Sequence, residues 1–143
     1  MTVSAWPIKV LAIDGRLDRV AKEVDRLLAL ISTERSPVRR ADALRILFGA
    51  VVHAKPRVTL RVIEALASAA FQPLQSGRRN RRGESELAIC LPAIARIDPG
   101  LAEKLLARLP PTQADPAREQ MVMMKTASLD QLVSWPHLGD HTA

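Results

Sequence analysis

Aromatic residues and cysteine are scarce in this sequence. Phenylalanine and tryptophan together make up 3% of the 143 residues, and tyrosine is absent. Few side chains are therefore present that could stack on unpaired bases, as many proteins that bind single-stranded nucleic acids do. The single cysteine, Cys90, excludes an internal disulfide, and its place in the apolar stretch 87–97 predicts a buried structural thiol.

Long apolar runs are also missing. None approaches the roughly 20 residues that a helix needs to cross a bilayer. Residues 1–13 carry no basic leader and are interrupted by Pro7, so we expect no signal peptide. The hydrophobic share of 48% is ordinary for a globular chain of a length that can bury a core without disulfides or metals. These observations predict a single domain spanning residues 1–143, located in the cytoplasm.

Groups of residues that carry catalysis are lacking as well. The sequence contains no glycine-rich phosphate loop, no nucleophile elbow and no paired-carboxylate motif. The histidines His53, His137 and His141 have no cysteine or carboxylate pair at metal-binding spacing, although Asp140 adjoins the last two. We therefore expect no enzyme activity, no metal and no cofactor. The two tryptophans, Trp6 and Trp135, lie near the ends of the sequence and are interpreted as capping contacts.

What the sequence does contain is helical periodicity. Apolar residues recur every three or four positions, and no stretch alternates as a strand does. Proline and glycine separate the periodic segments, and Asp115-Pro116 is interpreted as the start of a helix. The pattern predicts an all-α fold of six to seven helices, with a polar segment at residues 72–83. The expected helices cover about 16–31, 38–53, 56–70, 84–96, 101–109, 116–125 and a short piece at 129–135.

An internal repeat organises these helices. When residues 40–66 are laid over residues 83–109 without a gap, Leu44 falls on Leu87 and Pro56 falls on Pro99. Twelve of the 27 pairs are apolar in both copies, against about six expected from average apolar usage. The coincident prolines place the same break at the same point of two helical hairpins.

A period of 43 residues with two helices per unit resembles the HEAT and armadillo-like repeats. The segment 94–109, IARIDPGLAEKLLARL, is similar to the helix-turn-helix of such a repeat, and residues 13–17 echo part of it. The resemblance implies a solenoid of stacked antiparallel hairpins that binds macromolecules along one face, without catalytic residues. The repeat core would cover about residues 16–127, with helix 16–31 and the stretch 115–135 as end caps, and residues 128–143 would form a short C-terminal helix and a frayed tail.

Basic charge is concentrated in the middle of the sequence. Between Arg35 and Arg82 there are eleven Lys or Arg residues and only two acids, whereas the remainder is slightly acidic and the whole chain carries a net charge of +6. The 43-residue offset places Arg35 over Arg78 and Arg39 over Arg82. Because corresponding loops of stacked hairpins lie on one edge, we expect an arginine ridge there. Its members are Arg35, Arg39, Arg40, Arg78, Arg79, Arg81 and Arg82.

The arginine ridge has two interpretations. Beside helix N-termini, clustered guanidiniums can bind the phosphates of DNA or RNA, or an acidic partner protein. The alternative is a solvated loop that charge keeps soluble. A second cluster, residues 121–124, cannot turn all four of its apolar side chains to one side of a helix. It is therefore either packed into the stack or forms an adaptable surface of Met121, Met123 and Met124 for a partner or a homodimer.

Together these observations favour a non-enzymatic helical-repeat scaffold that acts through protein–protein interaction. The alternative is a nucleic-acid-binding protein that uses the arginine ridge. An enzyme is the third and least supported class, because it would need a pocket with perturbed carboxylates.

Overall fold

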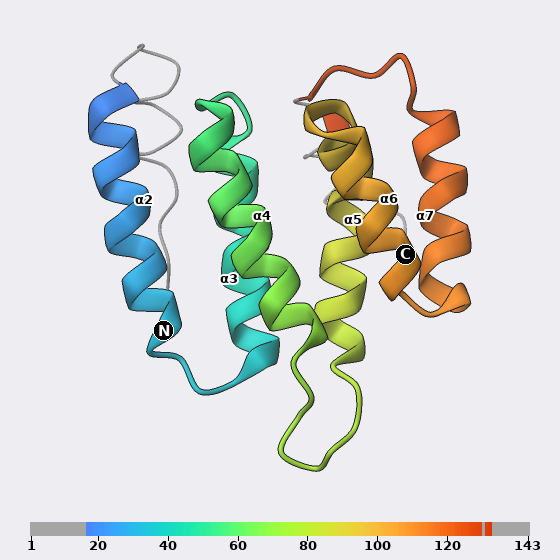
Figure 1. The fold of residues 1–143 in the computed structure, drawn as a ribbon, viewed down its shortest axis with the longest axis horizontal. Helices are drawn as coiled ribbons and strands as arrows, with labels where there is room; N and C mark the ends of the chain where they lie inside the picture. The colour runs from blue at the N-terminus through green and yellow to red at the C-terminus, as the bar shows by residue number, and fades with distance from the viewer. Residues whose placement is uncertain (1–16, 130, 133–143) are drawn as a thin grey trace.

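The computed structural model describes residues 17–129, 131 and 132, and within these residues it contains six helices and no strand. The predicted all-α fold is confirmed. In chain order the helices are α2 (Leu17–Ser32), α3 (Pro37–Val51), α4 (Pro56–Phe71), α5 (Arg81–Ile97), α6 (Pro99–Arg108) and α7 (Pro111–Met123) (Figure 1).

The helices form two layers of antiparallel neighbours. In Figure 1, α4 lies in front of α3 and α6 in front of α5, while α2 and α7 lie at the two ends of the row. Helix α5 contacts α3, α4, α6 and α7, and it is therefore the centre of the stack. The connections 33–36 and 72–80 lie on the same edge of the molecule, and the connections 52–55 and Asp98 lie on the opposite edge.

Proline begins four of the described helices. Pro37, Pro56, Pro99 and Pro111 each occupy the first turn, where the missing N–H costs no hydrogen bond. Pro56 and Pro99, which the repeat superimposes, are each the first residue of the second helix of a hairpin. The predicted turn at residues 98–100 is therefore shorter than expected, because Pro99 and Gly100 already belong to α6.

Two helices begin earlier than the sequence pattern indicated. Helix α5 begins at Arg81 rather than near Glu84, because the side chain of Asn80 accepts the N–H of Gly83 and caps the helix there. The predicted helix start at Asp115-Pro116 is wrong. Helix α7 begins at Pro111, and Pro116 lies inside it.

The early start of α7 has a physical explanation. Pro116 removes one helical hydrogen bond and crowds the preceding turn, which disfavours a helix through this position. Ala114 and Ala117, on either side of it, are both buried. Their packing against the rest of the stack offsets that cost, because tertiary burial outweighs local preference in most protein helices.

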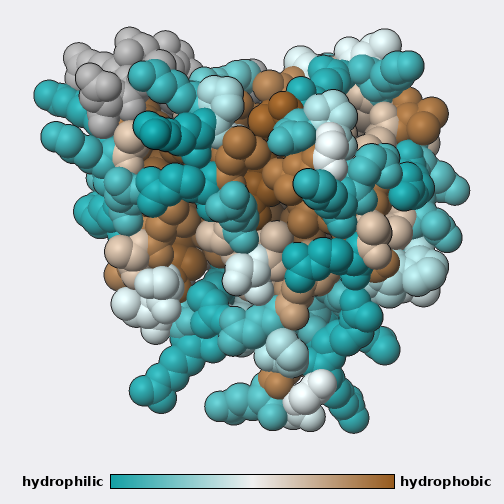
Figure 2. All heavy atoms as spheres, viewed as in Figure 1, coloured by the Kyte–Doolittle hydropathy of each residue, from teal (hydrophilic) through white to brown (hydrophobic). Residues whose placement is uncertain are grey.

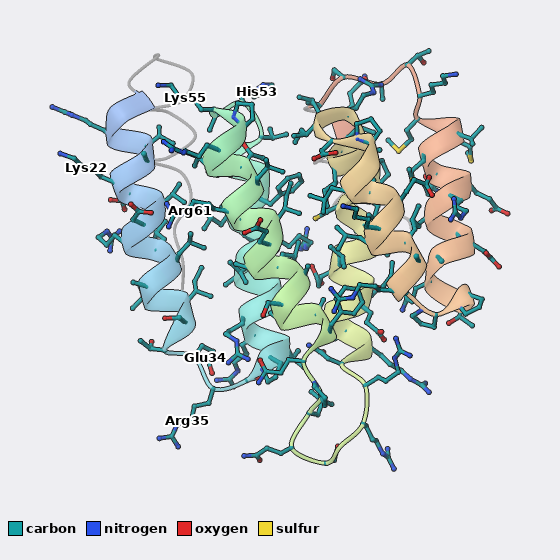
Figure 3. All side chains as sticks on the ribbon, in the orientation of Figure 1. Lys22, Glu34, Arg35, His53, Lys55 and Arg61 are labelled. Atoms are coloured by element: carbon teal, nitrogen blue, oxygen red, sulfur yellow. The ribbon has the colours of Figure 1, made fainter. Side chains whose placement is uncertain are left out.

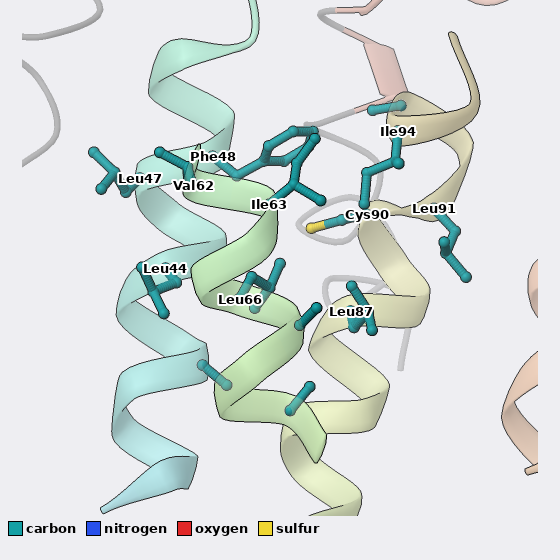
Figure 4. Packing of buried hydrophobic residues seen from close by; sticks show 14 of the residues in the cluster. Leu44, Leu47, Phe48, Val62, Ile63, Leu66, Leu87, Cys90, Leu91 and Ile94 are labelled. Carbon is teal, nitrogen blue, oxygen red and sulfur yellow. The ribbon is translucent and has the colours of Figure 1, made fainter. Parts of the chain in front are cut away.

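The core runs between the two layers. Leu44, Phe48, Ile63, Leu87 and Ile94 are all at most 2% exposed and come from three helices (Figure 4). Burial of one such side chain contributes about 1.5–3 kcal/mol. Residues superimposed by the 43-residue offset, such as Leu44 and Leu87, are buried in both hairpins.

The C-terminal part of the described chain also joins the core. Leu132 is 3% exposed and lies with Arg45, Phe48 and Cys90 around a cavity of about 20 Å³. Residues 129, 131 and 132 are helical, whereas the rest of the predicted helix 129–135 lies outside the described residues. None of the described helices is both long enough and apolar enough to cross a membrane.

Candidate functional site

The segments that carry the arginine ridge meet on one edge of the molecule. Arg35 lies in the connection 33–36 (Figure 3). Arg39 and Arg40 lie in the first turn of α3. On the neighbouring connection, residues 78 and 79 lie in the loop 72–80, whereas residues 81 and 82 belong to the first turn of α5. Because Figure 1 shows both connections on the same edge, the structure brings the seven arginines to that edge.

Two arginines of the ridge are bound to buried carboxylates. Nε and Nη2 of Arg79 donate to Oε2 of Glu84 over 3.0 and 2.6 Å, and Glu84 is only 2% exposed. Nε of Arg82 donates to Oε1 of Glu86 over 3.2 Å, and its Nη2 lies 3.9 Å from Asp42. Arg79 is the ion-pair partner of the buried Glu84, and Arg82 shares the buried Glu86 with Arg45 of α3, so the role of these two guanidiniums is largely structural.

Arg40 is engaged differently. Its guanidinium is half-buried and donates to the backbone carbonyl of Glu34 and to the side-chain oxygen of Gln72. Both acceptors are neutral, so they fix the position of the guanidinium without compensating its charge. Arg40 thereby connects the start of α3 with the end of α4.

The other four members of the ridge are exposed and lack an acidic partner in the described part of the chain: Arg35, Arg39, Arg78 and Arg81. The first turn of α3 contains no acidic residue. A cation at a helix N-terminus opposes the helix dipole and costs about 0.3–1 kcal/mol. The edge therefore carries an uncompensated positive field that favours anions.

A groove runs beside this edge, between α2 and α4. It has a volume of about 460 Å³, and Leu44 of α3 lines it together with residues of both helices. Its apolar walls include Leu28 and Ile31 of α2 and Ala65 of α4. Figure 2 shows the corresponding hydrophobic surface between α2 and α4. Arg40 lines the groove too, so the groove opens onto the arginine ridge.

A second groove lies on the other side of α4. It has a volume of about 330 Å³, and Ile63, Ala67, Leu101 and Leu105 form its apolar walls between α4 and α6. Ser68 lines both grooves. The face built from α2, α4 and α6, hereafter the groove face, thus offers two apolar depressions flanking one helix (Figure 2).

The methionine cluster divides between core and surface. Met121 and Met124 are partly buried and pack against the hydrophobic core. Met123 is 73% exposed, and its neighbour Val122 is 75% exposed. Of the three methionines expected at a partner surface, only Met123 is fully presented to solvent, and the structure adds Val122, which the sequence interpretation did not select.

Residues considered for catalysis or metal binding are dispersed or lie beyond the described chain. His53 is exposed in the turn after α3. His137, His141, Trp6 and Trp135 fall outside the described residues. Within residues 17–129, 131 and 132, no group of three His, Cys, Asp or Glu side chains is placed to hold a metal ion. Burial raises the pKa of the Cys90 thiol to about 12, so this cysteine is a poor nucleophile at neutral pH.

The groove between α2 and α4 is the feature that sequence reasoning missed. Its residues on α4 recur as Arg61, Glu64, Ala65, Ser68, Ala69 and Gln72. This spacing of three and four residues marks one face of the helix, and the small residues Ala65, Ser68 and Ala69 on it are a signal that the sequence did contain. Comparisons with protein-family models, with curated proteins and with solved structures give no significant match.

Proposed function

We propose that this protein is a non-enzymatic binding module that holds a segment of a partner protein along the groove face. The observation that carries the proposal is the groove between α2 and α4, which follows one face of α4 for three helical turns. Its apolar surface comes from Leu28, Ile31, Leu44, Ala65 and Ala69, and polar residues of α2, α3 and α4 lie among them. Concave sites of a few hundred cubic ångströms that combine apolar surface with polar groups are the usual form of binding sites.

The architecture supports this proposal. The hairpins α3–α4 and α5–α6 place α4 and α6 in one layer, with α2 continuing that layer (Figure 1). Stacked helical hairpins of the HEAT or armadillo kind bind partners along such a layer, and the pattern-level resemblance in the sequence points the same way.

Peptide-display selection on the purified protein tests the proposal. Ser68 is exposed and lines both grooves, so Ser68→Trp should block the groove face without disturbing the core. Ala107→Trp, at an exposed position of α6 that lines neither groove, is the matched control. We expect selected peptides to bind the wild type and Ala107→Trp equally and to lose binding to Ser68→Trp. Equal binding to all three proteins would exclude the groove face.

The arginine ridge supports a second candidate function, the binding of nucleic acid. The supporting observation is the set of four exposed guanidiniums without acidic partners in the described chain. Neutralisation of phosphates by several such groups makes affinity fall steeply with salt. The scarcity of aromatic residues favours duplex over single-stranded targets.

Fluorescence anisotropy with duplex DNA and single-stranded RNA, at about 50 and 200 mM salt, tests this second candidate. The ridge variant changes Arg35, Arg39, Arg78 and Arg81 to Ser. A control of equal charge changes four exposed basic residues elsewhere to Ser: Arg19, Lys22, Lys104 and Lys125. Binding that is steeply salt-dependent and lost only in the ridge variant would support nucleic-acid recognition. Equal loss in both variants would indicate unspecific charge attraction.

A further inference from the structure

The groove between α2 and α4 also indicates the chemistry of the partner that it binds. We infer that its partner is an amphipathic helix of about three turns with carboxylates at one end of its apolar stripe, and that these carboxylates bind at Arg40. This inference rests on the proposed function and names the chemistry of the partner. Three features of the groove carry the inference: its length, the charge at each of its ends and its apolar residues.

The length of the groove accommodates a helix of three turns. On α4 the lining residues run from Arg61 to Gln72 in steps of three and four, which corresponds to three turns. A helix laid into an apolar groove presents anchors at the same spacing, i, i+3 or i+4, and i+7. Leu28 and Ile31 of α2 form the facing wall, and Leu44 of α3 closes the floor.

The two ends of the groove differ in charge. At one end, Arg61 of α4 pairs with Asp25 of α2, and Figure 3 shows Arg61 between the two helices. That guanidinium is therefore already neutralised. At the other end, Arg40 has only neutral acceptors, the Glu34 carbonyl and the Gln72 amide. The groove thus has one compensated and one positive end.

The positive end is suited to carboxylates. Arg40 is half-buried, so water screens its charge less than that of a fully exposed side chain. A guanidinium held in a fixed position can donate two parallel hydrogen bonds to one carboxylate. Arg35 lies in the connection before α3 (Figure 3), and Arg39 lies in the first turn of α3. Both are exposed and can bind a second carboxylate.

Glu64 explains why the partner's acids belong at this end. It lines the groove one turn along α4 from Arg61 and has no ion-pair partner in the described part of the chain. A carboxylate on the partner would be repelled beside Glu64 and attracted beside Arg40. The charges therefore orient the partner helix as well as bind it.

The apolar residues of the groove distinguish this partner from a nucleic acid. Leu28 and Ile31 of the wall and Leu44 of the floor offer no donor for phosphate oxygens, so a polyanion would gain nothing from them and would contact mainly the arginines. An amphipathic acidic helix uses both features together. Nucleic-acid binding is accordingly an outcome that the experiment can detect.

Fluorescence anisotropy with three labelled 14-residue peptides tests the inference. The first peptide has leucines at helical spacing and three glutamates in its last turn. In the second peptide lysines replace the glutamates, and in the third a central proline breaks the helix. Titrated with the full chain, the first peptide should bind about tenfold more tightly than the second, and the third should not bind.

Variants separate the contributions of charge and groove. Arg40→Gln should lower the affinity for the acidic peptide about tenfold and leave the affinity for the lysine peptide unchanged. Because Arg40 also contacts Glu34 and Gln72, the double variant Arg35→Gln/Arg39→Gln, which alters only exposed side chains, provides a second measurement. This double variant should weaken binding of the acidic peptide severalfold. Ser68→Trp should abolish binding of every peptide.

The contrary outcomes are distinct. If the acidic and lysine peptides bind equally and Ser68→Trp blocks both, the groove binds helices without charge selection, so the inference is wrong and the proposed function stands. If Ser68→Trp leaves the acidic peptide bound and duplex DNA displaces it, the ridge alone attracts anions, and both proposals fail. If none of the peptides binds, the inference fails, and peptide-display selection decides the proposed function.

Discussion

Asn80 joins the end of α4 to the start of α5, because its side-chain Nδ2 donates to the backbone carbonyl of Ala69 over 3.1 Å. The side-chain oxygen of the same residue accepts the N–H of Gly83 over 2.9 Å. Asn80 is 2% exposed, so both hydrogen bonds are shielded from water. The loop 72–80, which carries Arg78 and Arg79 at its end, is thus tied at its C-terminal end to both helices.

Replacement of Asn80 should therefore be costly. Asn80→Ala removes a helix cap, worth about 1 kcal/mol, and leaves the Ala69 carbonyl without this donor, which adds about 1 kcal/mol or more. We expect the free energy of unfolding, measured in urea, to fall by about 2–3 kcal/mol. Ser36→Ala is the control, because Ser36 caps α3 through a longer bond of 3.3 Å at a less buried position. It should cost about 1 kcal/mol or less.

Glycine at position 83 is required by the same junction. A Cβ there would lie 2.4 Å from Nδ2 of Asn80 and 2.9 Å from the Cα of Ala70. Gly83→Ala should therefore destabilise the protein, although alanine is the better helix former. At Gly100, in the first turn of α6, a Cβ would meet only Asp98 Oδ1 at 3.5 Å, so Gly100→Ala should stabilise by about 0.5 kcal/mol. Thermal unfolding of both variants checks this: Tm should fall in Gly83→Ala and rise in Gly100→Ala.

Much of the fold could be predicted from the sequence because its signals are local. Helical periodicity and the prolines at 56 and 99 indicate where the hairpins turn, and a proline in the first turn is intrinsically favourable. The start of α5 could not be predicted in the same way. Arg81 and Arg82 are unfavourable residues for a helix N-terminus. The helix begins there because Asn80, which the Ala69 carbonyl holds in a buried position, caps it through the N–H of Gly83.

The candidate site also combines a feature that the sequence predicts with features that depend on tertiary contacts. The 43-residue offset predicts that the segments of the arginine ridge lie on one edge, because this placement depends only on the register of the two hairpins. Which arginines carry free charge depends on side chains that the fold brings close, such as Glu86 with Arg82. The groove beside the ridge depends on the spacing between α2 and α4, which no local pattern in the sequence encodes.

The ion pair between Arg45 of α3 and Glu86 of α5 yields a third prediction. Both side chains are largely buried, at 16% and 6% exposure. Arg45→Met alone should cost about 3 kcal/mol, because Glu86 then loses one of its two guanidinium partners in a buried position. The double variant Arg45→Met/Glu86→Leu should cost less than either single change, because no buried charge remains. Urea unfolding of the two single variants and the double variant completes a double-mutant cycle. If the losses in free energy of unfolding of the two single variants add up to that of the double variant, the pair does not interact.

The divided methionine cluster yields a fourth prediction. Met121 packs against the core, so Met121→Ser should lower the free energy of unfolding by about 1–2 kcal/mol. Met123 is 73% exposed, so Met123→Ser should change it by less than about 0.5 kcal/mol. Sedimentation equilibrium on the same proteins examines self-association. A dimer that is lost in Met123→Ser would assign this exposed patch to a homodimer contact.

The buried thiol of Cys90 makes stability depend on pH in the alkaline range. Burial raises its pKa from the ordinary value of 9.0 to about 12. Above pH 9 the unfolded chain loses this proton while the folded chain keeps it, so the free energy of unfolding should fall as the pH rises towards 12, and stay unaffected by this group below pH 9. The slope approaches about 1.4 kcal/mol per pH unit. Urea unfolding between pH 8 and 10.5 measures it, and Cys90→Ala should remove this part of the decline. An equal decline in both proteins would show that the thiol ionises as readily in the folded chain as in the unfolded one.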